Sequence, residues 1–159
     1  MQHFSKYSAD LGEISNMLKR DKNNTDFRED LIETGNGCPF CYQNLRGRIV
    51  DEYNSVFAIK DGYPVSDGHH LVIPKRHSDD YFSLTESEKL DADKLIQILR
   101  NQLLQDDRTI TGFNIGMNSG ESAGQTIFHC HIHLIPRRDG DTPAPRGGVR
   151  GVIPNKMGY

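Results

Sequence analysis

The strongest constraint on the fold is a run near the C-terminal end in which histidines alternate with single apolar residues, at His129, His131 and His133. Side chains on a β-strand point alternately to the two faces of a sheet. The run therefore predicts a strand within 126–135 whose histidines share one face at spacings of about 6.5 Å. Because imidazoles are costly to bury without a polar partner, this face is the first candidate for a functional site. The opposite face would join the core through Phe128, Cys130, Ile132 and Leu134.

Three upstream segments predict further strands that follow one another in a β meander. Ile49-Val50 and residues 55–59 are rich in β-branched and aromatic residues, and the Asp61-Gly62 pair after them is a hairpin signal. Residues 71–73 form a third short apolar run, which Pro74 ends.

A long helix is predicted to follow, because Thr85 and Glu88 have the spacing of a capping box. Residues 109–117 predict another strand before a Gly-rich loop at 118–124. Antiparallel strands with one helix inserted before the last two define an α+β fold and not an alternating βαβ one. The apolar stripe of the helix would be formed by Leu90, Leu95, Ile98, Leu99 and Leu103.

The chain has 159 residues, enough for one globular domain. We place that domain at 37–138, with 1–36 as an N-terminal helical extension and 139–159 as a Pro/Gly/Arg-rich tail. No stretch approaches the roughly 20 apolar residues of a membrane helix, and residues 1–10 lack the features of a secretory signal, so we expect a cytoplasmic protein with no membrane partner. The formal net charge of −3 gives no general attraction to polyanions and argues against nucleic acid as a partner.

The histidine face is compatible with two chemistries. A metal ion could be bound by all three imidazoles, or one histidine could attack a phosphoryl group while its neighbours orient that group. The loop immediately upstream favours the second, because Gly120 and Gly124 let backbone N–H groups approach an anion. Gln125 and Thr126 add neutral side-chain donors.

These residues resemble the histidine-triad (HIT) superfamily of nucleotide hydrolases and transferases, whose signature is three histidines separated by single apolar residues. The similarity covers 123–135 and extends back through 118–120, 71–77, Asp61 and Cys38-Pro-Phe-Cys41. It implies a HIT-like antiparallel β-sheet and a purine nucleotide as substrate. It also implies a homodimer in which the C-terminal segment of one protomer reaches the site of the other.

By this resemblance, His131 is the nucleophile that attacks the α-phosphorus, and His133 contacts the same phosphate. Neutral histidine already holds a lone pair at pH 7, so neither a separate base nor a catalytic metal is required. The resemblance further assigns phosphate binding and assistance to the leaving group to Asn118, Gly124, Gln125 and Thr126, and nucleoside binding to Asp61, on the ribose, and Ile59, near the base. Gly62 stands where the family often has a large aliphatic residue.

Cys38 and Cys41 form a two-thiolate knuckle, for which metal binding, a reduced redox pair and two incidental thiols are open interpretations. The resemblance implies a structural zinc completed by His77 and His129. Such a tetrahedral site has no open coordination position, so it would attach the knuckle to the sheet without taking part in the chemistry. Cys130 is expected to be a small buried residue.

The expected activity is cleavage at the α-phosphate of a (di)nucleoside polyphosphate through a nucleotidyl-histidine intermediate. The alternatives are a nucleoside phosphoramidase-like HIT hydrolase, a non-catalytic nucleotide-binding HIT protein, and a zinc hydrolase that uses all three histidines. His69 and His70 are expected to be ordinary polar residues before a strand. A hypothesis for the tail is that the distal phosphates are contacted by Arg137, Arg138 and Arg150.

Overall fold

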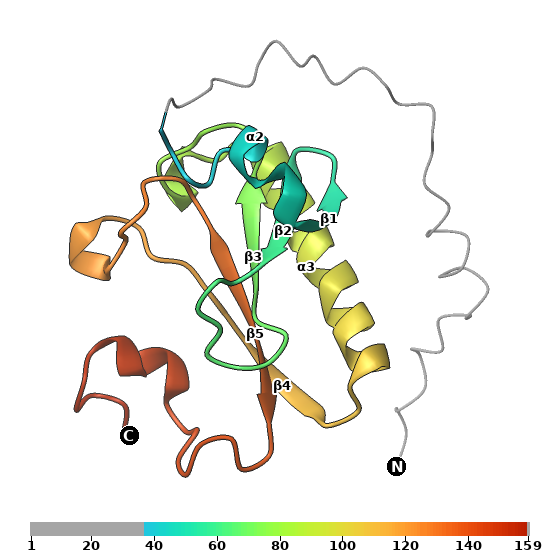
Figure 1. Ribbon diagram of the computed structural model, residues 1–159. Helices are drawn as coiled ribbons and strands as arrows, with labels where there is room; N and C mark the ends of the chain where they lie inside the picture. Colours follow the sequence, from blue (N-terminus) through green and yellow to red (C-terminus); the bar gives the residue numbers. More distant parts are fainter. Residues whose placement is uncertain (1–36, 159) are drawn as a thin grey trace, which may run out of the picture. The chain divides into compact units, whose positions relative to one another are not determined.

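The computed structural model describes residues 37–158, so the predicted extension at 1–36 lies outside the described part of the chain. An antiparallel five-stranded sheet in the order β1-β2-β3-β5-β4 carries one long helix (Figure 1), which confirms the predicted α+β fold. The strands are β1 (Ile49–Tyr53), β2 (Val56–Lys60), β3 (His70–Pro74), β4 (Ile110–Gly116) and β5 (Ile132–Arg138), and the helices are α2 (Tyr42–Leu45) and α3 (Glu86–Asp106). Short 3₁₀ turns lie at Arg46–Arg48, Tyr81–Ser83, Glu121–Ala123 and Gly148–Val152.

The first three strands form the predicted meander, but the tight turn lies before the expected hairpin signal. Strands β1 and β2 are joined by Asn54-Ser55, and Asn54 has a φ of 44°, which asparagine tolerates in a two-residue turn. The Asp61-Gly62 pair instead begins a longer connection, loop 61–69, between β2 and β3. A hydrogen bond from the N–H of Asp61 to the carbonyl of His69 (3.0 Å) closes this loop.

Helix α3 begins at the predicted capping box. The hydroxyl of Thr85 accepts from the N–H of Glu88 (3.2 Å), and the Glu88 carboxylate accepts from the N–H of Thr85 (2.8 Å). Arg76 donates to both oxygens of the same carboxylate, at 2.9 and 2.8 Å. Burial raises the pKa of Glu88, but the hydrogen bonds from Arg76 and Thr85 outweigh burial and hold the pKa below its ordinary value.

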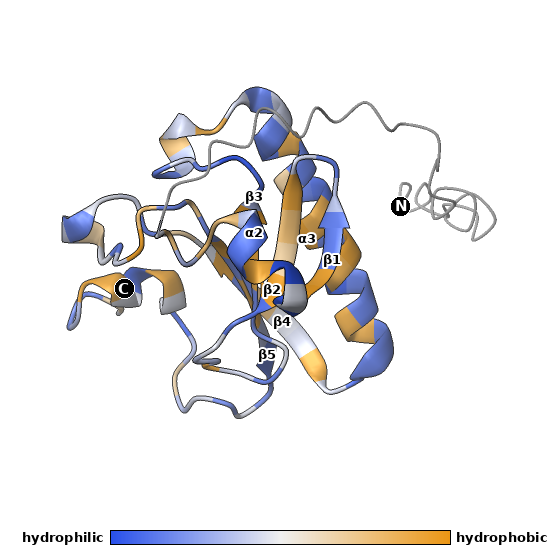
Figure 2. Ribbon diagram, turned by 45° about the horizontal axis from the view of Figure 1, so that its top comes forward, coloured by the Kyte–Doolittle hydropathy of each residue, from blue (hydrophilic) through white to orange (hydrophobic). Residues whose placement is uncertain are grey.

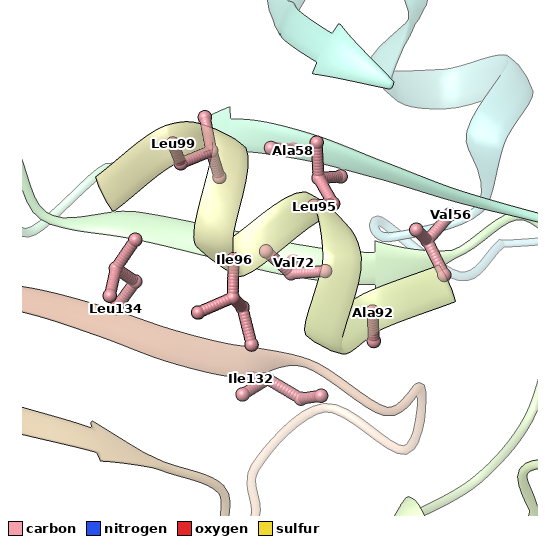
Figure 3. Close-up of a cluster of buried hydrophobic side chains, with 9 residues drawn as sticks. All are labelled: Val56, Ala58, Val72, Ala92, Leu95, Ile96, Leu99, Ile132 and Leu134. Carbon is pink, nitrogen blue, oxygen red and sulfur yellow. The ribbon is translucent and has the colours of Figure 1, made fainter. Parts of the chain in front are cut away.

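Helix α3 covers one face of the sheet. Leu90 was expected in the contact stripe but is 71% exposed. It precedes Leu95 by five residues, which on a helix of 3.6 residues per turn places it about 140° around the axis. Figure 3 shows the side chains that make the contact, namely Ala92, Leu95, Ile96 and Leu99 from the helix and Val56, Ala58, Val72, Ile132 and Leu134 from the sheet.

A second apolar cluster lies on the face opposite α3. Its buried members are Leu45, Phe57, Ile59, Leu71 and Ile73. Alternate residues of β2 and β3 thus fill clusters on both faces, which explains why these strands are almost continuously hydrophobic (Figure 2). His133 is paired with Leu71 across β5 and β3, so it lies on this second face.

No helix in residues 37–158 has the length and apolar character needed to cross a membrane.

The cap of α3 can be tested by removing its hydroxyl. We expect Thr85→Ala to lower the free energy of unfolding by about 1 kcal/mol, because the N–H of Glu88 loses its acceptor. Thr85→Ser keeps the acceptor and should remain near the wild-type value. Urea unfolding of the three proteins measures the difference, and equal stability of the two variants would contradict the assignment.

Candidate functional site

The three histidines do not lie on one strand. Strand β5 begins at Ile132, so His133 lies within it and His131 immediately precedes it. Upstream, the N–H of Cys130 donates to the carbonyl of Ser78 (2.6 Å), which takes this segment away from the β3 ladder. The predicted strand over 126–135 is therefore wrong in its first half.

The two faces predicted for this run are correct where the strand exists. Ile132 and Leu134 are buried in the core under α3, and Cys130 is 2% exposed. Phe128, which was assigned to the core, is 48% exposed because it precedes the strand and has no ladder to orient it.

His131 is a buried imidazole with a defined tautomer. Its Nδ1 lies 2.8 Å from the carbonyl of His129, and because a carbonyl can only accept, Nδ1 carries the proton. Nε2 therefore holds the lone pair. The ring also packs edge to face against Phe40, with ring centroids 5.0 Å apart, and against His133, with centroids 5.3 Å apart.

His133 forms a second unit with His69, a residue expected to be an ordinary polar side chain. His69 is 4% exposed, and its Nε2 lies 2.9 Å from Nδ1 of His133 and 3.3 Å from the Asp61 carboxylate. The one sequence signal for this contact was that His69 follows Asp61 by eight residues. A loop of that length between two paired strands, loop 61–69, brings its two ends together. His70 was also expected before a strand, but it is the first residue of β3, where it is 6% exposed and donates from Nδ1 to the carbonyl of Gly68 (2.6 Å).

Burial keeps this pair of imidazoles neutral. Burial, assisted by the neighbouring His131 and His69, lowers the pKa of His133 to about 4. Burial also lowers the pKa of His69, against the opposing effect of the Asp61 carboxylate. At neutral pH both rings are therefore uncharged, and each has one nitrogen that donates and one that accepts.

The Gly-rich loop is held by the side chain of Gln125, which is 3% exposed. Its amide oxygen accepts from the N–H of Gly120 (2.7 Å), and its amide nitrogen donates to the carbonyls of Asp79 (2.5 Å) and Ile127 (3.1 Å). These bonds use both the oxygen and the nitrogen of the amide. Gln125 would therefore have to break hydrogen bonds within the protein before it could contact a phosphate directly.

Asn118 and Gly124 are brought together by the same loop. A Cβ at Gly124 would lie 3.8 Å from Nδ2 of Asn118, and the φ of Gly124, 87°, is strained for any side chain. Thr126 is exposed beyond the loop, whereas Ile59 is fully buried in the cluster on the face opposite α3. Ile59 thus lies on the same face of the sheet as His133, but other side chains cover it completely.

Cys38, Cys41, His77 and His129 converge, with their ligand atoms within 4.8 Å of one another. The S···N distances are 3.6 Å from Cys38 to His129, 3.5 Å from Cys41 to His77, and 3.9 Å from Cys41 to His129. Ligands of a tetrahedral zinc, with Zn–S near 2.3 Å and Zn–N near 2.0 Å, are separated by about 3.5 Å. The donor set therefore fits zinc in both chemistry and spacing.

The outer nitrogens of the two histidines have partners of the kind that metal-bound imidazoles use. His129 donates from Nε2 to the carbonyl of Pro74 (2.9 Å), and Nε2 of His77 lies 3.5 Å from the Asp79 carboxylate. In each ring, the lone pair on Nδ1 then faces the cysteines. Burial raises the pKa of Cys130 to about 12, so the third cysteine stays a thiol, as expected of a small buried residue.

This geometry argues against a metal bound by all three histidines. Nδ1 of His129 faces the cysteines, and Nδ1 of His131 is occupied by the His129 carbonyl. The ring of His133 is instead joined to His69.

The arginines proposed for distal phosphates are engaged elsewhere. Arg137 is paired with Asp141 at 2.7 Å and bonded to Asn114, and Arg138 is paired with Asp107 at 2.6 Å. Arg150 donates to the carbonyl of Lys156 (3.1 Å). The hypothesis is therefore not supported for Arg137 and Arg138, whose guanidinium groups fix the end of β5.

The sequence matches a profile described as HIT domain over residues 43–140. An uncharacterized 16.1 kDa HIT-like protein of Mycoplasma pneumoniae is 40% identical over 105 residues, which is 64% of this chain and 72% of that protein. Adenylylsulfatase HINT3 of Arabidopsis thaliana is 34% identical over 67% of this chain and 55% of its own length. AP-4-A phosphorylase of Mycobacterium tuberculosis is 33% identical over 60% of this chain and 49% of its own.

Solved structures of histidine triad proteins are also similar to this chain. A hypothetical histidine triad nucleotide-binding protein of Sulfolobus tokodaii aligns with a TM-score of 0.59 and 38% identity over 67% of this chain and 72% of its own. A Zn-bound histidine triad family protein of Mycobacterium smegmatis aligns with a TM-score of 0.61 and 31% identity over 68% and 80%. With more than half of its length matched by the domain profile and the histidine cluster in place, the chain belongs to the HIT family.

Proposed function

We propose that this protein is a nucleotide hydrolase or nucleotidyltransferase that cleaves at the α-phosphate of a (di)nucleoside polyphosphate through a covalent nucleotidyl-histidine intermediate. The observation that carries the proposal is the hydrogen bond from Nδ1 of His131 to the carbonyl of His129. It leaves the lone pair on Nε2, so the imidazole is a nucleophile without a separate base.

In the first step, Nε2 of His131 forms a bond to the α-phosphorus, and the bond from that phosphorus to the leaving phosphate oxygen breaks. The imidazole becomes positively charged, and its Nδ1–H remains on the His129 carbonyl, which stabilises that charge. In the second step, water or another acceptor forms a bond to the phosphorus as the bond from Nε2 breaks, the attacking group releases its proton to solvent, and the ring is neutral again. The intermediate divides one difficult displacement into two easier ones.

The surrounding groups bind the phosphate and nucleoside. His133 contacts the phosphate, and Asn118, Gly124 and Thr126 supply neutral donors, while Gln125 keeps their loop in shape. Asp61 accepts from the ribose, with Ile59 shaping the floor near the base. Two of the relatives are an adenylylsulfatase and an AP-4-A phosphorylase, which supports an adenine nucleotide as the substrate.

A structural zinc at Cys38, Cys41, His77 and His129 would hold the knuckle against the segment that bears the nucleophile. When bound, the zinc would cross-link these four residues, and the histidines would carry out the phosphoryl transfer without it. The Zn-bound relative supports this assignment. The proposed site needs Cys38 and Cys41 as thiolates, which a reducing compartment such as the cytoplasm preserves.

We further propose a homodimer that forms along β4. This strand is at an edge of the sheet, and Ile115 on it is 49% exposed, so a second copy could pair with its open backbone groups.

The nucleophile is tested with a diadenosine tetraphosphate in the presence of EDTA. We expect the wild type to turn it over and His131→Ala to lose at least about 10³-fold in turnover. Acid-quenched wild type should carry an adenylyl group on His131 by mass spectrometry. His70→Asn, which keeps a donor for the Gly68 carbonyl, is the matched control. An active His131→Ala protein would refute the assigned nucleophile, and a wild type that binds nucleotide without any turnover would favour the non-catalytic alternative.

The metal site is tested by elemental analysis of the purified chain. We expect about one zinc per chain in the wild type, and near-complete loss in Cys38→Ser and Cys41→Ser, because each removes a thiolate ligand. Cys130→Ala should retain zinc, since this thiol lies outside the cluster. Zinc retention in both ligand variants would show that the cysteines do not bind it.

The neutral state of His133 makes stability depend on pH. In the unfolded chain this histidine takes up a proton near pH 6.5, whereas folded His133 resists protonation until about pH 4. Protons therefore favour unfolding throughout that interval, and the free energy of unfolding should fall as the pH drops through it. His133→Asn should remove up to about 3 kcal/mol of this loss in denaturant titrations. Parallel pH profiles for the two proteins would contradict a buried neutral imidazole.

A further inference from the structure

Loop 61–69 contains a hydrogen bond that determines where the proton of His69 resides. The N–H of Val65 donates to Nδ1 of His69 at 3.3 Å. A peptide N–H can only donate, so Nδ1 must be the accepting nitrogen of the neutral ring. The proton of His69 is therefore on Nε2.

The position of this proton determines that of His133. Nε2 of His69 lies 2.9 Å from Nδ1 of His133, and two facing ring nitrogens form a hydrogen bond when one donates and the other accepts. Since His69 donates, Nδ1 of His133 accepts and its own proton must be on Nε2. The Asp61 carboxylate, 3.3 Å from the same Nε2 of His69, accepts from that N–H as well and cannot reverse its direction.

We propose that the peptide N–H of Val65, acting through His69, fixes His133 in the tautomer with its proton on Nε2, so that a bound phosphate meets a hydrogen-bond donor. A phosphate oxygen is an acceptor, and the other tautomer would present a lone pair to it. The proposal rests on the proposed function only in identifying the bound group as a phosphate. Val65 and His69 are positioning residues in this scheme.

The loop is braced so that the Val65 amide stays directed at the ring. The N–H of His69 donates to the carbonyl of Ser66 (3.1 Å), and the Asp61 carboxylate accepts from the N–H of Tyr63 (2.8 Å). Arg138 donates to the Ser66 hydroxyl (2.9 Å) and to the carbonyl of Asp67 (3.2 Å). The arginine first assigned to a distal phosphate thus anchors the loop that orients the histidine pair.

Asp61, His69 and His133 also have the composition of a metal site, with ligand atoms within 4.8 Å of one another. A metal bound to Nε2 of His69 would require the ring proton to move to Nδ1, where it would point at the Val65 N–H. The loop backbone therefore favours the hydrogen-bonded chain over a metal ion at this position.

The test is ¹⁵N NMR of the histidine side chains in the full chain without substrate, because the shifts of the two ring nitrogens report the tautomer. We expect His69 and His133 to carry their protons on Nε2 and His131 on Nδ1. A proton on Nδ1 of His133 would overturn the proposal, and a proton on Nδ1 of His69 would overturn it and favour the metal site instead.

A variant pair isolates the amide. Val65→Pro removes the N–H, whereas Val65→Ala keeps it and changes only an exposed side chain. We expect Val65→Pro to give mixed tautomers at His133 and a loss of turnover of about 10-fold to 10²-fold with little change in KM. Val65→Ala should match the wild type. An unchanged His133 tautomer in a folded Val65→Pro protein would refute the role of the amide.

A second pair covers the case in which Val65→Pro does not fold. His69→Gln keeps an N–H near the original Nε2 and should preserve the His133 tautomer, whereas His69→Leu should lose it. Equal spectra for His133 in both would refute the relay. These readings need no substrate, so expected tautomers in a protein without turnover would contradict the proposed function and not the proton chain.

Discussion

The proposed chemistry of this protein depends on the hydrogen bond between Nδ1 of His131 and the carbonyl of His129. This bond assigns the lone pair of His131 to Nε2, and it connects the ring to a residue that is itself held by Pro74 and the cysteine pair. A backbone carbonyl is a fixed acceptor, so it defines the tautomer at no cost in side-chain ordering. The proposed nucleophile thus has its lone pair in place before any ligand binds.

The knuckle links this bond to the proposed zinc. Phe40 lies between Cys38 and Cys41 in the sequence and packs edge to face against the His131 ring. His129 contributes its side chain to the cysteine cluster and its carbonyl to His131. The proposed zinc site would therefore determine two contacts of the His131 ring, because residues 129–131 lie outside the ladder between β3 and β5.

Sequence reasoning was correct where the signal was local. The capping box at Thr85, the meander and the core positions Ile132 and Leu134 follow from spacing within one element. It was incomplete where contacts with another element decide: the N–H of Cys130 donates to Ser78 outside the β3 ladder, and Arg138, hypothesised to contact phosphate, is bonded to Asp107 and Asp67. Leu90 was a different error, because its helical angle could have been calculated from the sequence alone.

By itself, the sequence determined which chemical groups the site can use: histidines at alternate positions, a cysteine pair, and glycines in the loop before the histidines. Those identities supply the site with thiolates, imidazoles and backbone N–H groups. Only the tertiary structure decided which nitrogen of each histidine ring donates a hydrogen bond and which accepts one. A neutral imidazole has two possible tautomers, and the choice depends on which carbonyl, amide or ring faces it. His69 became part of the site only through the fold, since its ring partner His133 lies 64 residues away in the chain.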